Sequence, residues 1–475
     1  MDFFFNPDGI AVVGASNTRH KGGYNIVHNI IHGYKGRIYP VNSRYQEVQG
    51  LTCYPSMRNL PDRVDLAVVF VPAGAVPDVI EDCAVAGVRG VIIQSAGFAE
   101  VGPGGHELQQ RVKETAARHD IRLWGPNCIG LVDIGNRHVF SFVSPNILSG
   151  TVIPGRVSMI VQSGMLSGGF LQDMMTCDQM GFAKVCSIGN KMDVNECDVL
   201  AYLLDDPRTG VVGCYLETLA DGRRFVELCR RTDKPVVVIK GGRTEYGARA
   251  ASSHTASLAA DAAVVSGILA QAGAIEAFDF TQMANICNTL ALVRSRPVCE
   301  EGRVAILTYS GGAGILSTDL MAGRCLRPAE LRPETKERMA PVFPDWMPVN
   351  NPVDFWPAVE KSGVAETYTT CFQAVLADPG VDIVFMHLFT GSHLKLDLKA
   401  LADAAHLAGK PLFCWVIGDD QIRRQIKSTL QENGVPVFRE LDRAMACMAA
   451  LFQHRRAIMR RMGSGKASEQ KVAGN

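Results

Sequence analysis

The sequence predicts three doubly wound α/β domains in tandem, each built on a buried parallel sheet. Short apolar runs rich in β-branched residues alternate with longer segments of helical period, which is typical of parallel strands buried between helices. This pattern restarts after Gly155 and again after Gly302. A chain of 475 residues accommodates such domains at about 100–200 residues each. We place them at 1–130, 150–294 and 300–458, and we expect 459–475 to be an unstructured tail.

The apolar runs give the expected strands of each domain. The first domain has them at 9–16, 36–41, 65–71, 87–96 and 121–126. The second domain has them at 156–164, 181–190, 210–218 and 234–242, and the third at 303–312, 381–389 and 410–418. GRVSMIVQSGMLSGG from Gly155 is similar to GRVAILTYSGGAGIL from Gly302, so we expect the second and third domains to share a topology.

Composition excludes several classes of protein. Lys+Arg and Asp+Glu both number 48, which argues against a general nucleic-acid binder and against a disordered acidic chain. No apolar stretch approaches the roughly 18 residues of a transmembrane helix, and the N-terminus has no basic region or cleavage site of a signal peptide. The 14 Cys are dispersed without CxxC or zinc-ligand spacing. We expect a cytoplasmic protein without a metal site, membrane partner or nucleic-acid partner.

The turn after the first strand is a candidate anion site. It precedes a helix, whose N–H groups and dipole favour negative charge. It offers a tight-turn glycine, three polar side chains and one cation, namely Gly14, Ser16, Asn17, Thr18 and Lys21. The turn is not GxGxxG, and the second strand ends at Asn42 and Arg44 without a carboxylate, so NAD is disfavoured. A plain strand–helix turn is the alternative.

Four further turns lie at carboxyl ends of expected parallel strands, where doubly wound sheets bind ligands. They are SAGFAE from Ser95, WGPNCIG from Trp124, VQSGMLSGG from Val161 and SIGNKMDV from Ser187. VQSG stands between a strand and a helix, which suggests a second anion site, and Asn190 or Lys191 could meet a polar substrate. Each of these turns alone is a weak signal.

The most specific stretch is KGGRTEYGARAASSHTASLAADAA from Lys240. Small residues surround His254, which leaves its imidazole accessible, and imidazole is a good nucleophile toward phosphoryl groups near neutral pH. Glu217 ends another strand and is a candidate partner, because a carboxylate on one ring nitrogen fixes the tautomer and leaves the other nitrogen free to attack. A structural histidine is the alternative.

Taken together, these segments resemble the α subunit of the NDP-forming acyl-CoA synthetases, relatives of succinyl-CoA synthetase. The resemblance runs from about Phe5 to about Asp354 and includes GGAG at Gly311 and NPVDF at Asn351. It implies a Rossmann-like CoA-binding domain followed by two flavodoxin-like domains. It also implies an acid–thiol ligase that interconverts carboxylic acid, CoA and ATP with acyl-CoA, ADP and phosphate, through an acyl phosphate and a phosphohistidine.

The resemblance also assigns roles. His254 is the phosphorylated nucleophile and Glu217 its orienting carboxylate. The phosphoryl group is bound by Gln162, Ser163 and Gly164. The acyl pocket lies near Met165, Asn190, Lys191 and Met192. CoA is held by Gly14, Ser16, Asn17, Thr18, Lys21, Asn42, Gln94, Ser95, Ala96, Asn127 and Cys128.

The family phosphorylates ADP or GDP on an ATP-grasp module that binds Mg²⁺, and no segment after Asp354 resembles one. The resemblance therefore implies a separate ATP-grasp β subunit, in an α2β2 heterotetramer, that carries ATP/ADP and Mg²⁺. His254 would then travel between two sites on its Gly- and Ala-rich segment.

Some motifs depart from the family pattern without removing a required chemical group. VQSG replaces SQSG, SHTASLAA replaces SHTGSLAG, Arg19 and His20 stand where proline is common, and GNKMD replaces GNKAD at Met192. They leave the carboxylic acid open. Two alternatives stay open as well: a non-catalytic CoA-binding module, and a nucleotide-independent transferase of acyl or carbamoyl groups.

Overall fold

The computed structural model describes residues 1–145, 153–164, 169, 172–175, 180–255, 261–293, 302–391 and 396–472, with only the backbone of 252–255 and 462–472. The chain divides into two compact units, Met1–Ala284 and Asn285–Asn475. The N-terminal unit contains two large sheets and the C-terminal unit contains one, so the expected tandem α/β fold is confirmed.

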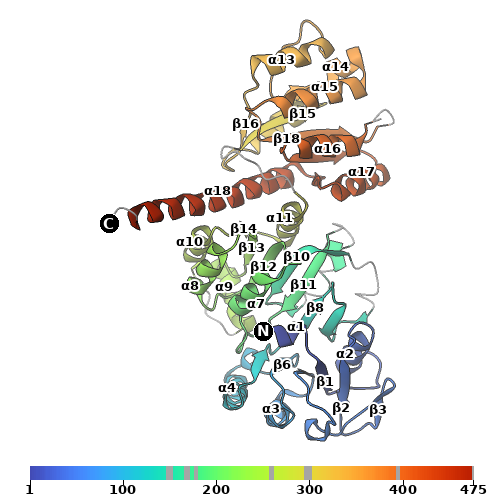
Figure 1. Ribbon diagram of the computed structural model, residues 1–475, viewed down its shortest axis with the longest axis vertical. Helices are drawn as coiled ribbons and strands as arrows, with labels where there is room; N and C mark the ends of the chain where they lie inside the picture. The colour runs from blue at the N-terminus through green and yellow to red at the C-terminus, as the bar shows by residue number, and fades with distance from the viewer. Residues whose placement is uncertain are drawn as a thin grey trace. The chain divides into compact units, whose positions relative to one another are not determined.

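The first sheet is parallel, with the strand order β2-β1-β5-β6-β7. α2 covers one face, and α3 and α4 cover the other (Figure 1). Every residue of β1, β5 and β6 is buried, as strands covered on both faces require. The elements are α1 (Asp2–Phe5), β1 (Gly9–Val13), α2 (Gly22–Ile31), β2 (Arg37–Val41), β3 (Glu47–Val48), β4 (Leu51–Thr52), β5 (Leu66–Val69), α3 (Val76–Val85), β6 (Gly90–Ile93), α4 (Pro103–Arg118) and β7 (Arg122–Trp124).

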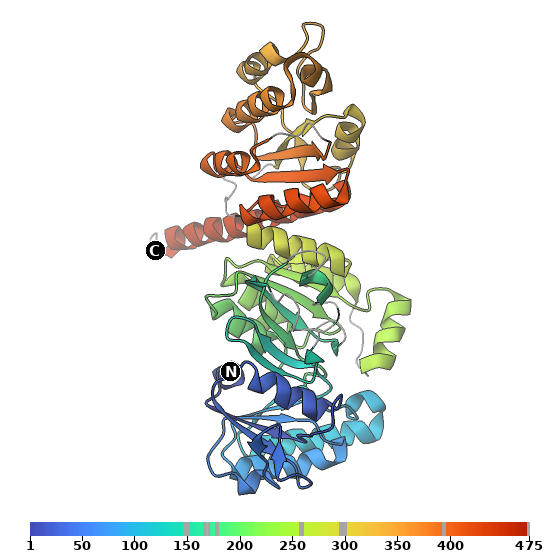
Figure 2. The ribbon, with the colours of Figure 1, turned by 90° about the vertical axis from the view of Figure 1, so that its right-hand side faces the viewer.

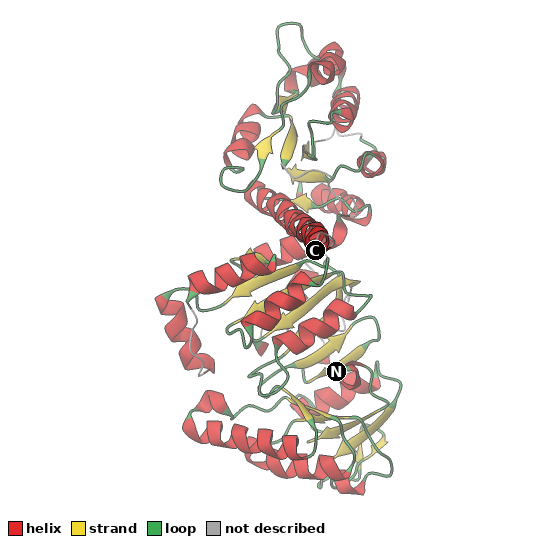
Figure 3. Ribbon diagram, turned by 60° about the vertical axis from the view of Figure 1, so that its left-hand side comes forward, coloured by secondary structure: helices red, strands yellow, loops and turns green. Residues whose placement is uncertain are grey.

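The second sheet has the order β14-β13-β12-β10-β11-β8-β9. Helices α7, α8 and α10 lie together on one of its faces. Figure 3 distinguishes the strands of the sheets, in yellow, from the helices that pack on them, in red. Its elements are β8 (Gly130–Asp133), β9 (His138–Ser141), β10 (Pro154–Val161), β11 (Phe182–Ser187), α7 (Glu196–Asp205), β12 (Val211–Leu216), α8 (Gly222–Arg230), β13 (Val236–Lys240), α9 (Glu245–Thr255), α10 (Ala262–Ala272), β14 (Ile275–Ala277) and α11 (Phe280–Leu292).

Strands β8 and β9 were not among the expected strands. They lie between the boundaries proposed for the first two domains, and they extend the second sheet by antiparallel pairing. Both strands are short and mix polar with apolar residues, so the pattern of apolar runs did not reveal them. One hydrophobic core joins α2 to β9 and to the face of the second sheet, which makes the N-terminal unit continuous.

A buried ion cluster holds β8 to β11 inside this unit. The Lys184 side chain is fully buried, and its Nζ lies 2.7 Å from Asp206 Oδ2 and 3.3 Å from Asp133 Oδ2. Arg208 adds a 2.8 Å ion pair to Asp133. Thr209 Oγ1 donates to Asp206 Oδ2 at 2.7 Å. These interactions offset the free-energy cost of removing the charges of Lys184, Asp133 and Asp206 from water.

The third sheet lies in the C-terminal unit and is parallel, with the order β16-β15-β18-β19-β20 and β17 beside β15. Its elements are β15 (Arg303–Thr308), α12 (Gly311–Asp319), β16 (Arg327–Pro328), α13 (Pro333–Met339), β17 (Val353–Asp354), α14 (Trp356–Ser362), α15 (Val364–Ala377), β18 (Ile383–Phe389), α16 (Leu398–Leu407), β19 (Leu412–Ile417), α17 (Asp420–Glu432), β20 (Val437–Phe438) and α18 (Leu441–Val472).

The C-terminal residues differ from their expected state. α18 continues through Val472 as one long helix, so most of the expected unstructured tail at 459–475 is helical (Figure 2). The stretch has no proline, and its Arg, Met, Lys, Ala, Gln and Glu residues are good helix formers that offset the cost of two glycines. Within the described residues, no helix combines the length and apolarity needed to cross a membrane.

Candidate functional site

The second sheet brings several predicted site residues to one edge. β12 lies between β13 and β10, and β11 follows β10, so the turns after these four strands are neighbours. Gln162 to Gly164 follow β10, Glu217 follows β12, and Asn190 and Lys191 come after β11. β13 leads through Gly241 and Gly242 into α9, which contains His254. The sequence therefore places its candidate chemistry at the carboxyl ends of parallel strands.

His254 lies near the end of α9, for which the structure describes only the backbone at this residue. Its pairing with Glu217 therefore remains a prediction. Met165, expected in the acyl pocket, lies outside the described residues.

Gln162 holds the turn that carries Glu217. Its side-chain Oε1 accepts hydrogen bonds from the backbone N–H of Glu217 at 2.8 Å and of Thr218 at 3.1 Å. Its Nε2 lies 3.4 Å from Thr218 Oγ1, and the residue is 6% exposed. The amide is thus engaged inside the protein, which differs from the predicted phosphate contact. Ser163 and Gly164 are half-buried and remain the candidates for that contact.

The surroundings of Glu217 combine burial with opposite charge. Glu217 is 7% exposed and Lys240 is 4% exposed. Burial lowers the pKa of Lys240, and the negative charge of Glu217 opposes that shift. Burial, the charge of Glu217 and a hydrogen bond to its side chain raise the pKa of Tyr215 to about 12. Neither Lys240 nor Tyr215 was singled out as a site residue from the sequence, because Lys240 comes from the neighbouring strand and Tyr215 stands in an apolar run.

Lys191 ties the turn after β11 to the turn after Glu217. Its Nζ donates to Glu196 Oε2 and to the Thr218 backbone oxygen, each at 2.9 Å. Its side chain is only 6% exposed, so Lys191 is a structural tie rather than an open pocket residue. Met192 is 5% exposed and packs in the core of the first sheet, on the side of α3 and α4. Both side chains are engaged inside the protein, and the place of Lys191 and Met192 in the acyl pocket stays a prediction.

Asn190 belongs to a polar network that joins the first and second sheets. Its Nδ2 donates to Glu100 Oε2 at 2.6 Å, and Asn127 Nδ2 lies 3.4 Å from its Oδ1. Burial alone would raise the pKa of Glu100, but hydrogen bonds from Gly97 N–H and Asn190 outweigh it and leave the pKa lowered. An ionised Glu100 therefore links the turn after β6, SAGFAE, to the turn after β11, SIGNKMDV. The sequence did not predict a contact between these two turns.

The turn after β1 has the geometry of an anion site. Gly14 has φ +93°, and a Cβ at this position would lie 2.2 Å from Phe70 O, so only glycine fits. Ser16 Oγ accepts from Thr18 N–H at 3.0 Å. Hydrogen bonds with Ser16 and Thr18 are the main causes that lower the pKa of Tyr45.

Two cations reinforce this turn. The positive charges of Lys21 and Arg44 also lower the pKa of Tyr45, so these groups lie around the same hydroxyl. A group of hydroxyls and cations before the N-terminus of α2 suits a phosphate. Tyr45 was missed from the sequence because it lies after β2, far along the chain from Ser16.

The other predicted CoA residues differ in what their side chains do. Asn17 Nδ2 donates to Glu47 O at 2.8 Å, and Asn42 Nδ2 donates to Ala15 O at 2.8 Å, so both brace the turn. Ala96 is exposed, and Asn127 is half-buried with a left-handed φ of +54°. None of these side chains offers a charge.

Three of those residues face inward. Gln94 Nε2 donates to Phe140 O at 2.8 Å, and Ser95 Oγ donates to Val71 O at 2.6 Å. Cys128 is 2% exposed, and burial raises its pKa to about 12. Their side chains are engaged in or sealed by the protein interior, so they support the turns rather than contact a ligand directly.

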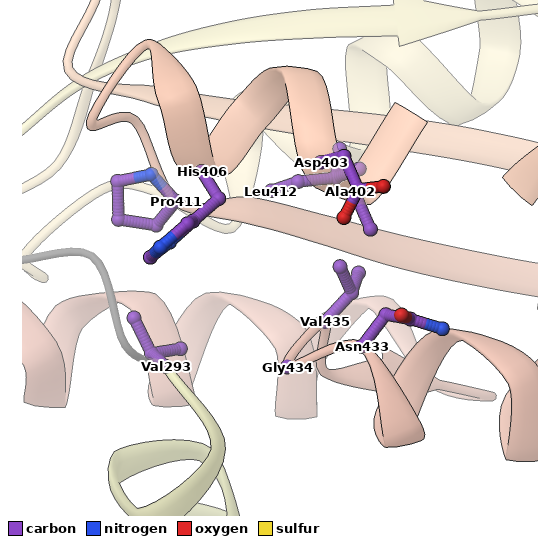
Figure 4. A pocket seen from close by; sticks show the side chains of 9 residues that line it. All are labelled: Val293, Ala402, Asp403, His406, Pro411, Leu412, Asn433, Gly434 and Val435. Carbon is purple, nitrogen blue, oxygen red and sulfur yellow. The ribbon is translucent and has the colours of Figure 1, made fainter. Parts of the chain in front are cut away.

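A pocket of the C-terminal unit lies at the amino ends of β19 and β20 (Figure 4). It is lined by Val293, Ala402, Asp403, His406, Pro411, Leu412, Asn433, Gly434 and Val435. None of the predicted site residues belongs to it, and doubly wound sheets bind ligands at the opposite, carboxyl edge. No cluster of three or more His, Cys, Asp or Glu residues suits a metal ion in the part of the chain that the structure describes.

Comparison with known proteins agrees with this geometry. Residues 8–133 match the family model of a CoA binding domain, and residues 154–290 match that of a succinyl-CoA ligase like flavodoxin domain. The chain is 33% identical to the α subunit of an ADP-forming acetate–CoA ligase II from Pyrococcus furiosus, covering 96% of this chain and 98% of that relative.

Two further similar proteins differ from each other in how much of their length this chain spans. An ADP-forming acetate–CoA ligase II from Archaeoglobus fulgidus is 36% identical over 93% of this chain, which spans 65% of that longer relative. A solved structure of acetyl-coenzyme A synthetase 1 from Ca. Korarchaeum cryptofilum, in complex with phosphate and ADP, has a TM-score of 0.86 and 32% identity. It covers 98% of both chains.

Proposed function

Because the chain belongs to the family of ADP-forming acyl-CoA synthetases, acid–thiol ligases related to succinyl-CoA ligase, we propose that it is the catalytic α subunit of such an enzyme. The reaction interconverts a carboxylic acid, CoA and ATP with acyl-CoA, ADP and phosphate. The observation that carries this proposal is the shared edge of the second sheet, where Glu217, the Ser163–Gly164 turn and the entry to α9 are neighbours.

In the direction of ATP synthesis, a phosphate oxygen attacks the thioester carbonyl, the C–S bond breaks, and CoA leaves as the thiolate and takes a proton. An imidazole nitrogen of His254 then attacks phosphorus, and the carboxylate leaves. ADP finally accepts the phosphoryl group from His254. Ser163 and Gly164 donate to the transferring group, and Glu217 fixes the His254 tautomer and stabilises the charged ring.

CoA binds on the first domain in this proposal. The phosphates of CoA lie at the turn from Gly14 to Lys21, where Ser16, Thr18 and Tyr45 offer hydroxyls. The carboxylic acid stays open, and acetate, named in the relatives, is the first to test.

The nucleotide site is on a separate ATP-grasp β subunit that holds ATP/ADP and Mg²⁺, in an α2β2 assembly. The α-subunit names of two relatives that this chain covers almost entirely support a partner subunit. We place the enzyme in the cytoplasm, in keeping with cysteines that form no disulfide in the part of the chain that the structure describes.

The test is phosphorylation of the chain. The chain, co-expressed with its ATP-grasp partner, is incubated with Mg²⁺ and [γ-³²P]ATP, and the label is tested for stability. We expect an acid-labile, alkali-stable label on this chain that is absent from His254→Asn, because a phosphoramidate is hydrolysed in acid.

Two other results would overturn the proposal. CoA binding without any label, in the presence of a partner that binds ATP, would indicate a non-catalytic CoA-binding module. Acyl transfer to phosphate that persists in His254→Asn without the partner would indicate a nucleotide-independent transferase.

A second prediction concerns CoA. Lys21→Ala is expected to weaken CoA binding about 10- to 100-fold, because a hydrogen bond to a charged group contributes roughly 1.5–3 kcal/mol. Isothermal titration with CoA at low and high salt measures the change, which should shrink as salt screens the charge. Lys35→Ala is the matched control, since Lys35 is an exposed lysine of the same domain. Equal CoA affinity in both variants would contradict a phosphate contact at Lys21.

A further inference from the structure

Tyr215 lies beside Glu217 on the same strand edge. It belongs to β12, which ends at Leu216, and Glu217 is the first residue after that strand. Its hydroxyl forms a hydrogen bond with the Glu217 side chain, and burial together with the Glu217 charge disfavours loss of its proton. The hydroxyl therefore acts as the donor and the carboxylate as the acceptor.

Gly241 confirms how closely these two side chains are packed. A Cβ at Gly241 would lie 2.9 Å from Tyr215 Oη and 3.5 Å from Glu217 Cγ. The end of β13 thus passes directly over both groups, and only a residue without a side chain fits there without displacing them.

The backbone and the ring of Tyr215 are also held in place. Its carbonyl oxygen accepts from Gln162 N–H at 3.0 Å, and its ring packs against Phe280 with centroids 5.3 Å apart. The side chain of Gln162 holds the backbone of Glu217 in turn. Gln162 therefore holds the backbone of Glu217 at the end of β12. Tyr215 is placed to hold the carboxylate of Glu217 in one orientation.

We propose that Tyr215 is a positioning residue that holds the Glu217 carboxylate in the orientation needed to pair with His254. This inference rests on the proposed function. The terminal torsion of a glutamate is broad, so an unrestrained carboxylate rotates freely. Buried Lys240 is also close enough to influence Glu217 electrostatically and would compete for it. A fixed donor to the carboxylate restricts that rotation.

The test is a double-mutant cycle on the rate of phosphohistidine labelling. Tyr215→Phe removes only the hydroxyl, Glu217→Gln removes the charge, and the double variant combines them, all in the complex with the partner subunit. We expect Tyr215→Phe to lower the maximal labelling rate about 10- to 100-fold without changing the affinity for CoA. In the Glu217→Gln background, the same change should have an effect of less than about threefold, because a residue that acts through Glu217 has nothing left to orient.

Tyr202→Phe is the matched control. The Tyr202 hydroxyl also donates to a carboxylate, Asp2 Oδ1, at 3.4 Å, and that tyrosine lies on α7 away from the turns of the site. Its removal should leave the labelling rate unchanged. If Tyr215→Phe does not fold, Tyr215→Met keeps an apolar side chain against Phe280 and replaces it in the cycle.

The outcomes separate this inference from the proposed function. Labelling of the wild-type chain with an equal loss from Tyr215→Phe in both backgrounds, or with no loss at all, would overturn the role of Tyr215 and leave the proposed function intact. Absence of label in the wild-type complex would overturn the proposed function, and the role of Tyr215 with it.

Discussion

Glu217→Gln is expected to lower the rate of phosphohistidine formation by about 10²- to 10⁴-fold. A carboxylate on one ring nitrogen fixes the imidazole tautomer and stabilises the positive charge that develops as the other nitrogen attacks phosphorus. Glutamine has nearly the same size but no charge, and its amide can present a donor where the ring N–H requires an acceptor. The loss should therefore appear in the chemical step.

The measurement is a quenched-flow time course of labelling at saturating Mg-ATP, together with the CoA affinity, which should not change. Glu227→Gln is the control, because Glu227 is an exposed carboxylate on α8. A labelling rate for Glu217→Gln equal to that of the control would show that Glu217 has no role in the mechanism. The positioning role proposed for Tyr215 would then fall as well.

The ends of the strands were predictable because the residue pattern that marks them is local in sequence. Apolar runs followed by small polar turns mark the carboxyl ends of parallel strands, and these ends meet at one edge of a sheet. This reasoning placed Ser163, Glu217 and the segment leading to His254 after the carboxyl ends of strands, and the strand order makes these turns neighbours. Glycine at Gly14 was predictable in the same way, since a tight turn after a buried strand requires a left-handed residue.

The direction of individual side chains was not predictable. Gln162 reads as a phosphate ligand in sequence, yet it turns inward because two backbone N–H groups after β12 need an acceptor. Lys191 reads as a substrate contact, yet a buried carboxylate and a backbone oxygen bind its ammonium group. Such pairings depend on contacts between strands that are distant in sequence. Tyr215 escaped notice for a different reason, because a tyrosine in an apolar run normally indicates core packing alone.

The buried cluster around Lys184 gives the second large effect, this time on stability. Lys184→Met is expected to lower the free energy of unfolding of the N-terminal unit by about 3–5 kcal/mol at pH 7, because Asp206 and Asp133 lose their fully buried cation and keep only the partly exposed Arg208. Lys399→Met is the control. Lys399 forms an exposed i,i+4 pair with Asp403, so its removal should cost less than about 1 kcal/mol.

The pH dependence of this difference tests its electrostatic origin. Burial alone would raise the pKa of Asp206, but hydrogen bonds from Lys184 and Thr209 and the Lys184 charge outweigh it, so the folded-state pKa is lowered. A lowered carboxyl pKa stabilises the fold above the unfolded value of about 3.9, and this contribution is lost as the pH falls through the folded-state value. In Lys184→Met the Asp206 carboxylate loses that support and binds a proton at a higher pH. Urea unfolding of both proteins should therefore show a difference that is largest near pH 7 and shrinks toward pH 4. A difference that stays constant over this range would mean that Lys184 stabilises the sheet through the packing of its methylene chain, with the ion pairs making no net contribution.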